Sequence, residues 1–138
     1  MAAYELTDAL LEEINQETAD FIVLNFANTD MVGHTGIFSA AQKAAEVVDS
    51  CVGRIVEAAL KHNYTTFILA DHGNSDCMVN EDGSPNTQHS TNPVPLIVVD
   101  KNRRWNLKHG KLGDIAPTIL TVMQIPIPTE MIGDILVS

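Results

Sequence analysis

The sequence predicts an α/β fold, because three apolar runs alternate with helical patterns along the chain. The runs at 20–26, 65–70 and 94–99 are rich in β-branched and aromatic residues, which favours strands covered on both faces. A long helical pattern separates the first run from the second, and strands joined through a helix form parallel crossovers. We therefore expect a mostly parallel sheet flanked by helices. Three such strands leave two open edges, so we expect the sheet to be incomplete within this chain.

The first half of the chain contains two helical patterns around the first predicted strand. Residues 5–18 place apolar side chains at helical spacing among many acids, which predicts an amphipathic helix. Residues 27–36 are rich in Asn, Asp, Thr and Gly, a composition typical of a loop. A long helix is predicted from 39 to about 62, ending at Asn63, by apolar residues that recur at steps of four and three: Ala41, Ala45, Val48, Val52, Ile55 and Ala59.

The last third of the chain contains one further helix. Residues 100–111 are polar and hold five of the eight basic residues, which indicates a surface loop. Gly113 opens a helical segment that runs to about Met123, and Pro117 fits its first turn, where a missing N–H costs little. The tail from 125 to 138 is short and mixed in character.

Composition bounds the partners of the protein. Its 138 residues fit one domain, and 45% apolar with 19% charged residues is globular composition. A net charge of −10 argues against nucleic acid or anionic membranes, which require clustered basic residues. No apolar run approaches the roughly 20 residues that cross a bilayer. Two cysteines without metal-binding spacing, and no charged-then-apolar leader, lead us to expect free thiols and a cytoplasmic location.

Five potential metal ligands stand just after, or between, the predicted strands: Asp30, His34, Asp71, His72 and His89. Ligands of open α/β sheets bind beyond the carboxyl ends of the strands. Carboxylate and imidazole donors without thiolate suit Mn²⁺, Zn²⁺ or Mg²⁺. Five ligands are too many for one open catalytic zinc site, but they are natural for two neighbouring ions that share a phosphoryl oxygen.

Each of these residues also has a simpler interpretation. Asp30 and His34 have the i,i+4 spacing of one helix face, yet the glycines of that segment favour a loop. Asp71 and His72 would point to opposite sides of an extended chain, so they share an ion only if the backbone turns there. Taken alone, His89 is more typical of a surface loop than of a metal site.

The distribution of basic residues adds a further constraint. No Lys or Arg occurs across 21–36 or 65–99, so these segments are suited to hold cations and not to grip a phosphorylated substrate. Arginines that bind a phosphate ester would have to come from residues outside this chain. No serine stands in a GxSxG context, so no nucleophile is recognisable.

Three runs occur in order along the chain: NFANTDMVGHTG at 25–36, ADHGN at 70–74 and HSTNPVP at 89–95. They resemble runs of cofactor-independent phosphoglycerate mutase, a family of the alkaline phosphatase superfamily. The runs GDIAPT at 113–118 and PTEMIG at 128–133 are similar to the closing segment of that family. The resemblance covers nearly the whole chain, and it implies an alkaline-phosphatase-like α/β fold.

The resemblance also implies an activity and a ligand assignment. Members of the family interconvert 3-phosphoglycerate and 2-phosphoglycerate through a phosphoserine intermediate. They use two divalent ions, for which we expect Mn²⁺, with Zn²⁺, Mg²⁺ and Co²⁺ as alternatives. Asp30, His34 and His89 match the ligands of one ion, whereas Asp71 and His72 match half of those of the other. The family's other ligands, an N-terminal aspartate and the nucleophilic serine, would lie upstream of this chain.

Residues 1–138 are accordingly expected to form the C-terminal segment of the metal-binding, phosphatase-like domain, without the N-terminal segment and the inserted substrate-binding domain. We expect the N-terminal segment to complete the sheet, phosphoglycerate to be the substrate of the complete enzyme, and this chain to be inactive alone. Two alternatives are another phosphomutase or phosphatase of the superfamily, such as phosphopentomutase, and a non-catalytic metal-binding remnant.

Overall fold

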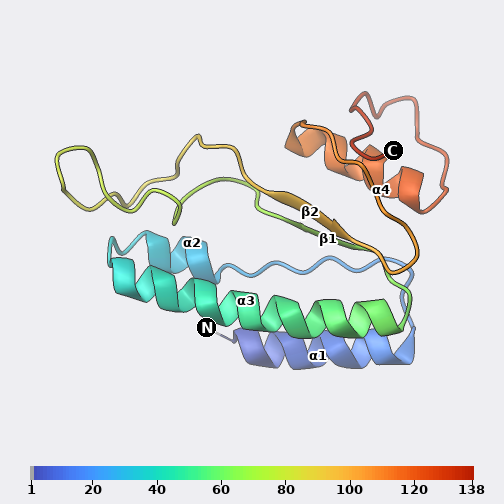
Figure 1. The fold of residues 1–138 in the computed structure, drawn as a ribbon, viewed down its shortest axis with the longest axis horizontal. Coiled ribbons are helices and arrows are strands. Elements are labelled where there is room, and N and C mark those ends of the chain that lie inside the picture. Colours follow the sequence, from blue (N-terminus) through green and yellow to red (C-terminus); the bar gives the residue numbers. More distant parts are fainter. Residues whose placement is uncertain (1) are drawn as a thin grey trace. The chain divides into compact units, whose positions relative to one another are not determined.

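The structure, a computed structural model, describes residues 2–138 as two compact units that meet at Lys101 and Asn102. The first unit contains α1 (Ala3–Gln16), α2 (Asn28–Gly33), α3 (Phe38–Lys61), β1 (Thr66–Leu69) and β2 (Leu96–Val99) (Figure 1). The second unit contains the 3₁₀ turn η1 (Leu112–Asp114) and α4 (Ile115–Val122). Within the described residues, no helix combines the length and the apolar character needed to cross a membrane.

Helices α1 and α3 lie side by side and form the main packed layer of the first unit (Figure 1). Both confirm the predicted helices at nearly the predicted bounds. Most of the side chains buried on the two helices are small, which lets helices approach closely. The residues buried on the two helices are Ala3, Thr7 and Ile14 of α1, and Ala41, Ala44, Cys51, Ile55 and Ala59 of α3.

Asn63 ends α3 as predicted. Its φ of 60° is left-handed, a conformation that asparagine tolerates better than most residues. The next residue, Tyr64, donates its backbone N–H to the Ala59 carbonyl at 2.9 Å, which closes the helix in a Schellman-type turn. Tyr64 also donates its hydroxyl to the Ala19 carbonyl at 2.6 Å. This turn directs the chain from α3 into β1.

Strands β1 and β2 lie within the predicted runs but pair antiparallel, with Thr66 opposite Val99 and Leu69 opposite Leu96. The expected parallel sheet is therefore not seen among residues 2–138. The crossover argument required a helix between strands, and β1 and β2 are joined by a long loop without one. We refer to residues 70–95 as the β1–β2 loop; Figure 1 shows it extending well beyond the strands.

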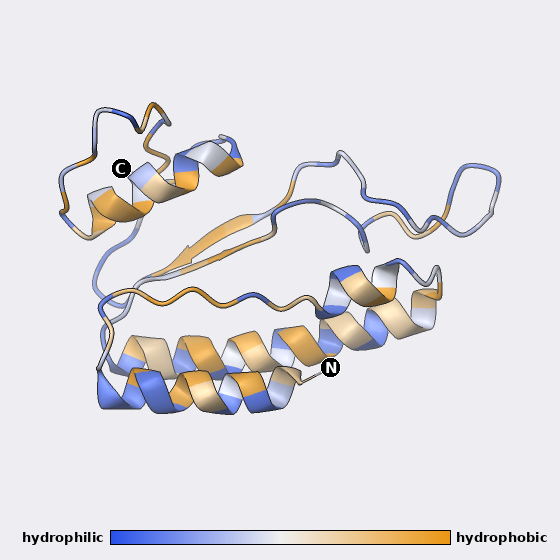
Figure 2. Cartoon of the chain, turned by 180° about the vertical axis from the view of Figure 1, so that it is seen from behind, coloured by the Kyte–Doolittle hydropathy of each residue, from blue (hydrophilic) through white to orange (hydrophobic). Residues whose placement is uncertain are grey.

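The prediction of a strand at 20–26 is wrong for this structure, because residues 21–26 are irregular. The segment still alternates between more and less exposed side chains, and Phe21 and Val23 are 54% and 77% exposed. Figure 2 shows its hydrophobic colouring between α1 and α2. A strand is defined by a hydrogen-bonded neighbour, and none pairs with this segment among residues 2–138.

The second unit is built around the buried carboxylate of Asp114, and α4 confirms the helix predicted after Gly113. Asp114 accepts hydrogen bonds from the backbone N–H groups of Lys111 and Asp134, each at 2.9 Å. Thr118 is fully buried; it donates to the Asp114 carbonyl at 2.6 Å and accepts from the Leu136 N–H at 2.9 Å. These bonds attach the C-terminal segment to the start of α4.

Candidate metal centre

Asp30 lies in α2 and His34 is the residue that caps the C-terminus of this helix, which corrects the loop predicted for residues 27–36. The i,i+4 spacing therefore does place both side chains together, with Asp30 Oδ1 3.3 Å from His34 Nε2. The helix is short and ends before Gly36, whose φ of 69° is left-handed. A Cβ at Gly36 would also lie 2.9 Å from Pro85, so glycine is required twice over at this position.

The orientation of the His34 ring follows from its second nitrogen. His34 Nδ1 lies 2.7 Å from the Thr87 carbonyl of the β1–β2 loop. A carbonyl only accepts, so Nδ1 carries the proton and donates. The lone pair is then on Nε2, the atom that faces Asp30, and this is the tautomer that a metal-binding histidine needs.

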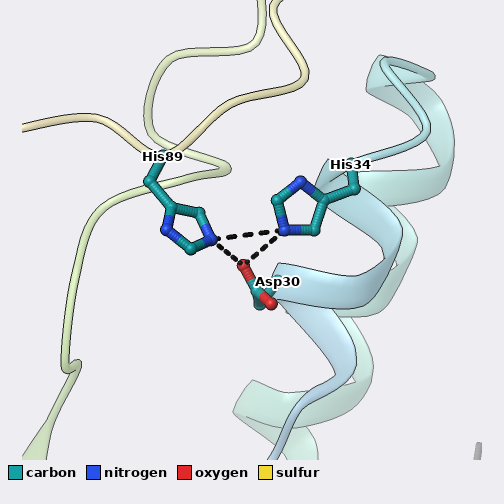
Figure 3. Close-up of side chains that lie close together, drawn as sticks. All are labelled: Asp30, His34 and His89. Carbon is teal, nitrogen blue, oxygen red and sulfur yellow. Dashed lines mark hydrogen bonds and ion pairs between the residues drawn. The ribbon is translucent and has the colours of Figure 1, made fainter.

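His89 approaches the same point from the returning arm of the β1–β2 loop. Its Nε2 lies 3.1 Å from Asp30 Oδ1 and 3.2 Å from His34 Nε2 (Figure 3). Within residues 2–138, these three side chains are the group whose donor atoms all lie within 4.8 Å of one another. They converge although His89 is 55 residues from His34 in the sequence.

The spacing of the three donor atoms fits a single ion. Ligand atoms at about 2.1 Å from a metal lie about 3.0 to 3.4 Å apart in octahedral or tetrahedral geometry. The three observed distances, 3.1, 3.2 and 3.3 Å, fall in that range. The side chains are 35–48% exposed, so the site is open to solvent on one side. One oxygen and two nitrogens thus form an open facial set of ligands.

Asp30 is held in its ionised form. Burial opposes its ionisation, but the hydrogen bond from Asn74 and the neighbouring histidines His34, His89 and His72 outweigh that cost, so the pKa of Asp30 lies below its usual value. A carboxylate that is already ionised at neutral pH presents its full charge to a cation.

Asp71 and His72 follow β1, and His72 lies against this group of three residues. His72 stacks on His89 with ring centroids 3.7 Å apart and planes inclined by 21°. The backbone bends at Asp71 and His72, and Asp71 Oδ1 lies 3.7 Å from His72 Nε2. The Asp71 side chain is 69% exposed and does not join the three-residue group.

Asn74 is a site residue that the sequence reasoning missed. It is only 7% exposed, and its Nδ2 donates to Asp30 Oδ1 at 2.8 Å. The absence of a side chain at Gly33 makes room for it, because a Cβ there would collide with the Asn74 amide. Ser75 adds a second tie by donating to the Thr29 carbonyl at 2.9 Å. The ADHGN run contains Asn74, but no spacing rule distinguishes a positioning amide from a loop amide.

Comparisons with known proteins agree with this picture. A family model described as the Metalloenzyme superfamily matches residues 1–127. The chain is 58% identical over 131 residues to a 2,3-bisphosphoglycerate-independent phosphoglycerate mutase of Flavobacterium johnsoniae, covering 95% of this chain and 26% of that protein. It is 52% identical over 138 residues to the enzyme of the same name from Bacteroides thetaiotaomicron, covering 100% of this chain and 27% of that one.

A solved structure gives the same result for the fold. The chain superposes on a crystal structure of Leishmania mexicana phosphoglycerate mutase at low cobalt concentration, with a TM-score of 0.89 and 26% identity. The match covers 100% of this chain and 28% of the other. The α/β class and the resemblance to phosphoglycerate mutase are thereby confirmed, and the chain spans about a quarter of the length of these relatives. The family match and the donor group of Asp30, His34 and His89 together support the use of divalent metal, and the chain belongs to the Metalloenzyme superfamily.

Proposed function

We propose that residues 1–138 form the C-terminal segment of the metal-binding, phosphatase-like domain of a cofactor-independent phosphoglycerate mutase. The observation that carries the proposal is the convergence of Asp30, His34 and His89 at ligand-to-ligand distances of 3.1–3.3 Å. The named relatives favour the mutase over other phosphomutases or phosphatases, because eight curated relatives that are 51–60% identical to the chain all have that name.

The five predicted ligands divide between two divalent ions in this proposal. Asp30, His34 and His89 bind one ion, and Asp71 with His72 supplies part of the shell of the other. The stack of His72 on His89 supports two neighbouring sites, because it brings the two ligand sets side by side. We propose Mn²⁺ for both, since carboxylate and imidazole donors without thiolate suit it, with Zn²⁺, Mg²⁺ and Co²⁺ as competitors.

Bound divalent ions would supply charge neutralisation for a phosphoryl group and lower the pKa of a nearby hydroxyl. The residues of this chain would bind the ion and orient its ligands. Asp30 contributes the fixed negative charge, His34 keeps its Nε2 lone pair toward the site through its bond to Thr87, and Asn74 orients the Asp30 carboxylate. The serine that would carry the phosphoryl group between 3- and 2-phosphoglycerate, and the arginines that would bind the substrate, come from outside residues 1–138.

We propose that the N-terminal segment of the complete enzyme adds strands to this chain. The exposed apolar side chains of Phe21 and Val23 support this, because their alternation along 21–26 is that of a strand face without a neighbour. Within the described residues, Cys51 and Cys77 form no disulfide, which fits the proposed location in a reducing cytoplasm.

The experiment that tests the function combines metal binding with complementation. Mn²⁺ titration of the 138-residue chain, followed by the EPR signal of free Mn²⁺, should show binding that His34→Gln abolishes and His109→Gln leaves unchanged. The chain alone should not convert 3-phosphoglycerate. Mixed with residues equivalent to the first three quarters of a relative, it should restore turnover. A wild-type chain that binds no Mn²⁺, or a reconstituted mixture that prefers pentose phosphates, would refute the assignment.

A further inference from the structure

The carboxylate of Asp76 connects the two arms of the β1–β2 loop close to the candidate metal centre. Its Oδ2 accepts a hydrogen bond from Ser90 Oγ at 2.8 Å and another from Asn92 Nδ2 at 2.6 Å. Asp76 lies on the outgoing arm, whereas Ser90 and Asn92 lie on the returning arm. One side chain therefore holds together two segments that are 14 and 16 residues away along the sequence.

The backbone is paired at the same place. The Ser90 N–H donates to the Gly73 carbonyl at 2.9 Å, and these two residues form an isolated antiparallel bridge. A Cβ at Gly73 would collide with Ser90 Oγ and lie 2.7 Å from Asp76 Oδ1. The absence of a side chain at Gly73 thus leaves room for the contact between carboxylate and hydroxyl. We call Asp76, Ser90 and Asn92 the carboxylate clamp.

The carboxylate clamp adjoins both imidazoles of the stack. Gly73 follows His72, and Ser90 follows His89, so the clamp and the bridge fix the two backbone positions next to the rings. His89 has few other restraints, because its side chain is 48% exposed. Its contacts are the stack on His72 and the polar approach to Asp30 and His34.

The clamp is also well suited chemically to hold its geometry. The hydrogen bonds from Asn92 and Ser90 keep the pKa of Asp76 below its usual value. At neutral pH, Asp76 is therefore an ionised acceptor of two hydrogen bonds, and such charge-assisted bonds are stronger than those between neutral groups.

We propose that Asp76 is a positioning residue for the metal centre, which sets the place of His89 through Ser90 and Asn92. Asp76 itself is not a ligand in this proposal, and its role rests on the proposed metal-binding function. Partners behind the ligands of metal sites commonly change metal affinity by about 10- to 100-fold when they are removed. Loss of the clamp should act in the same way, by releasing His89 from the position opposite Asp30 and His34.

The test uses the full 138-residue chain with Asp76→Ala, Ser90→Ala and a matched control, Asp82→Ala. Asp82 also accepts hydrogen bonds from a serine, Ser84, through its N–H at 2.9 Å and its hydroxyl at 2.6 Å, but at the tip of the same loop. The metal-free readout is the NOE between ring protons of His72 and His89. The second readout is Co²⁺ titration, followed by visible absorption. Far-UV circular dichroism verifies that α1 and α3 remain folded.

The wild-type chain and Asp82→Ala should show the NOE, and Asp76→Ala should lose it and bind Co²⁺ about 10- to 100-fold more weakly. Ser90→Ala, which keeps the carboxylate and removes one donor, should fall between them. The proposal is overturned if Asp76→Ala retains the NOE and an affinity equal to that of Asp82→Ala, or if the wild-type chain shows no NOE. A chain in which the NOE depends on Asp76 but no variant binds Co²⁺ would refute the metal function and uphold the positioning role.

Discussion

Replacement of Asn74 tests how the candidate site is held before any metal binds. Asn74 is 7% exposed, and its amide donates to Asp30 Oδ1 at 2.8 Å. Asn74→Ala removes this donor. Asn74→Asp keeps the shape but places a second carboxylate against Asp30, so the two substitutions separate the loss of a hydrogen bond from charge repulsion.

The expected size of the effect follows from the exposure of Asp30. A hydrogen bond to a charged group contributes about 1.5 to 3 kcal/mol to stability. The Asp30 side chain is 35% exposed, so water can replace the lost amide, and we expect Asn74→Ala to lower the free energy of unfolding by only about 1 to 1.5 kcal/mol. Asn74→Asp should cost more at pH 7, because two like charges then face each other. It should recover toward the Ala variant as the pH falls and a carboxyl becomes protonated.

Urea unfolding followed by circular dichroism measures the free energy, and ¹³C NMR of the Asp30 carboxyl reports its titration. The Asn74 hydrogen bond lowers the pKa of Asp30, so that pKa should rise in Asn74→Ala. Asn80→Ala is the matched control, since Asn80 donates to Ser84 Oγ at 3.0 Å in the exposed loop tip and has no contact with Asp30. The reasoning fails if Asn74→Ala behaves like Asn80→Ala and Asn74→Asp is no less stable than Asn74→Ala at pH 7.

Three further predictions concern packing and pH. Thr118→Val should leave the Leu136 N–H buried without an acceptor and destabilise the second unit by about 1 to 3 kcal/mol, measured by urea unfolding with Trp105 fluorescence; an unchanged midpoint would contradict it. Two backbone N–H donors, of Lys111 and Asp134, hold the pKa of Asp114 below its usual value. The ionised Asp114 therefore stabilises the fold fully at any pH above the ordinary carboxyl pKa, and this stabilisation is lost as the pH falls through the lowered pKa of the folded state. In Asp114→Asn, acid titration of the same fluorescence should lack that part of the transition. Gly33→Ala should destabilise the first unit by about 1 to 3 kcal/mol, because its Cβ would collide with Asn74 of the β1–β2 loop. Gly53→Ala, whose Cβ would meet nothing within 4 Å, should stabilise α3 by about 1 kcal/mol. Equal effects in thermal unfolding would refute the packing argument.

The helices with long apolar stripes could be predicted from sequence because their pattern is local. In α3, Ala41, Ile55 and Ala59 of the predicted stripe are buried, whereas Ala45 is exposed and the neighbouring Ala44 is buried instead. Helix α2 could not be predicted in the same way. Its glycines argue against a helix, and Gly33 is instead required by the tertiary contact with Asn74, which lies in a distant loop.

The pairing of the strands could not be predicted from local sequence. Composition identified the runs that contain β1 and β2, but the direction of pairing depends on the path of the chain between them, which apolar content does not encode. The segment 21–26 has the alternation of a strand and lacks a neighbour within residues 2–138. This pattern supports the proposal that strands of a longer protein pair with the segment, and the relatives are about four times as long as this chain.

Asp30, His34 and His89 were named from the sequence and lie together in the structure, whereas the residues that support them were not predicted. The reason lies in how the three side chains are held. Asp30, His34 and His89 are 35–48% exposed, so hydrogen bonds and not apolar burial hold them. His34 donates to the Thr87 carbonyl, Asn74 donates to Asp30, and the carboxylate clamp holds the backbone beside His89. Such bonds compete with water and, at side chains this exposed, contribute only about 1 to 1.5 kcal/mol each. A cation that binds only the assembled arrangement adds about 2.7 kcal/mol at one hundred times its dissociation constant, more than any one of these bonds. Metal binding and ordering of the β1–β2 loop should therefore be one coupled equilibrium. In it, the hydrogen bonds that hold the ligands determine the metal affinity, and the bound ion determines how ordered the loop is.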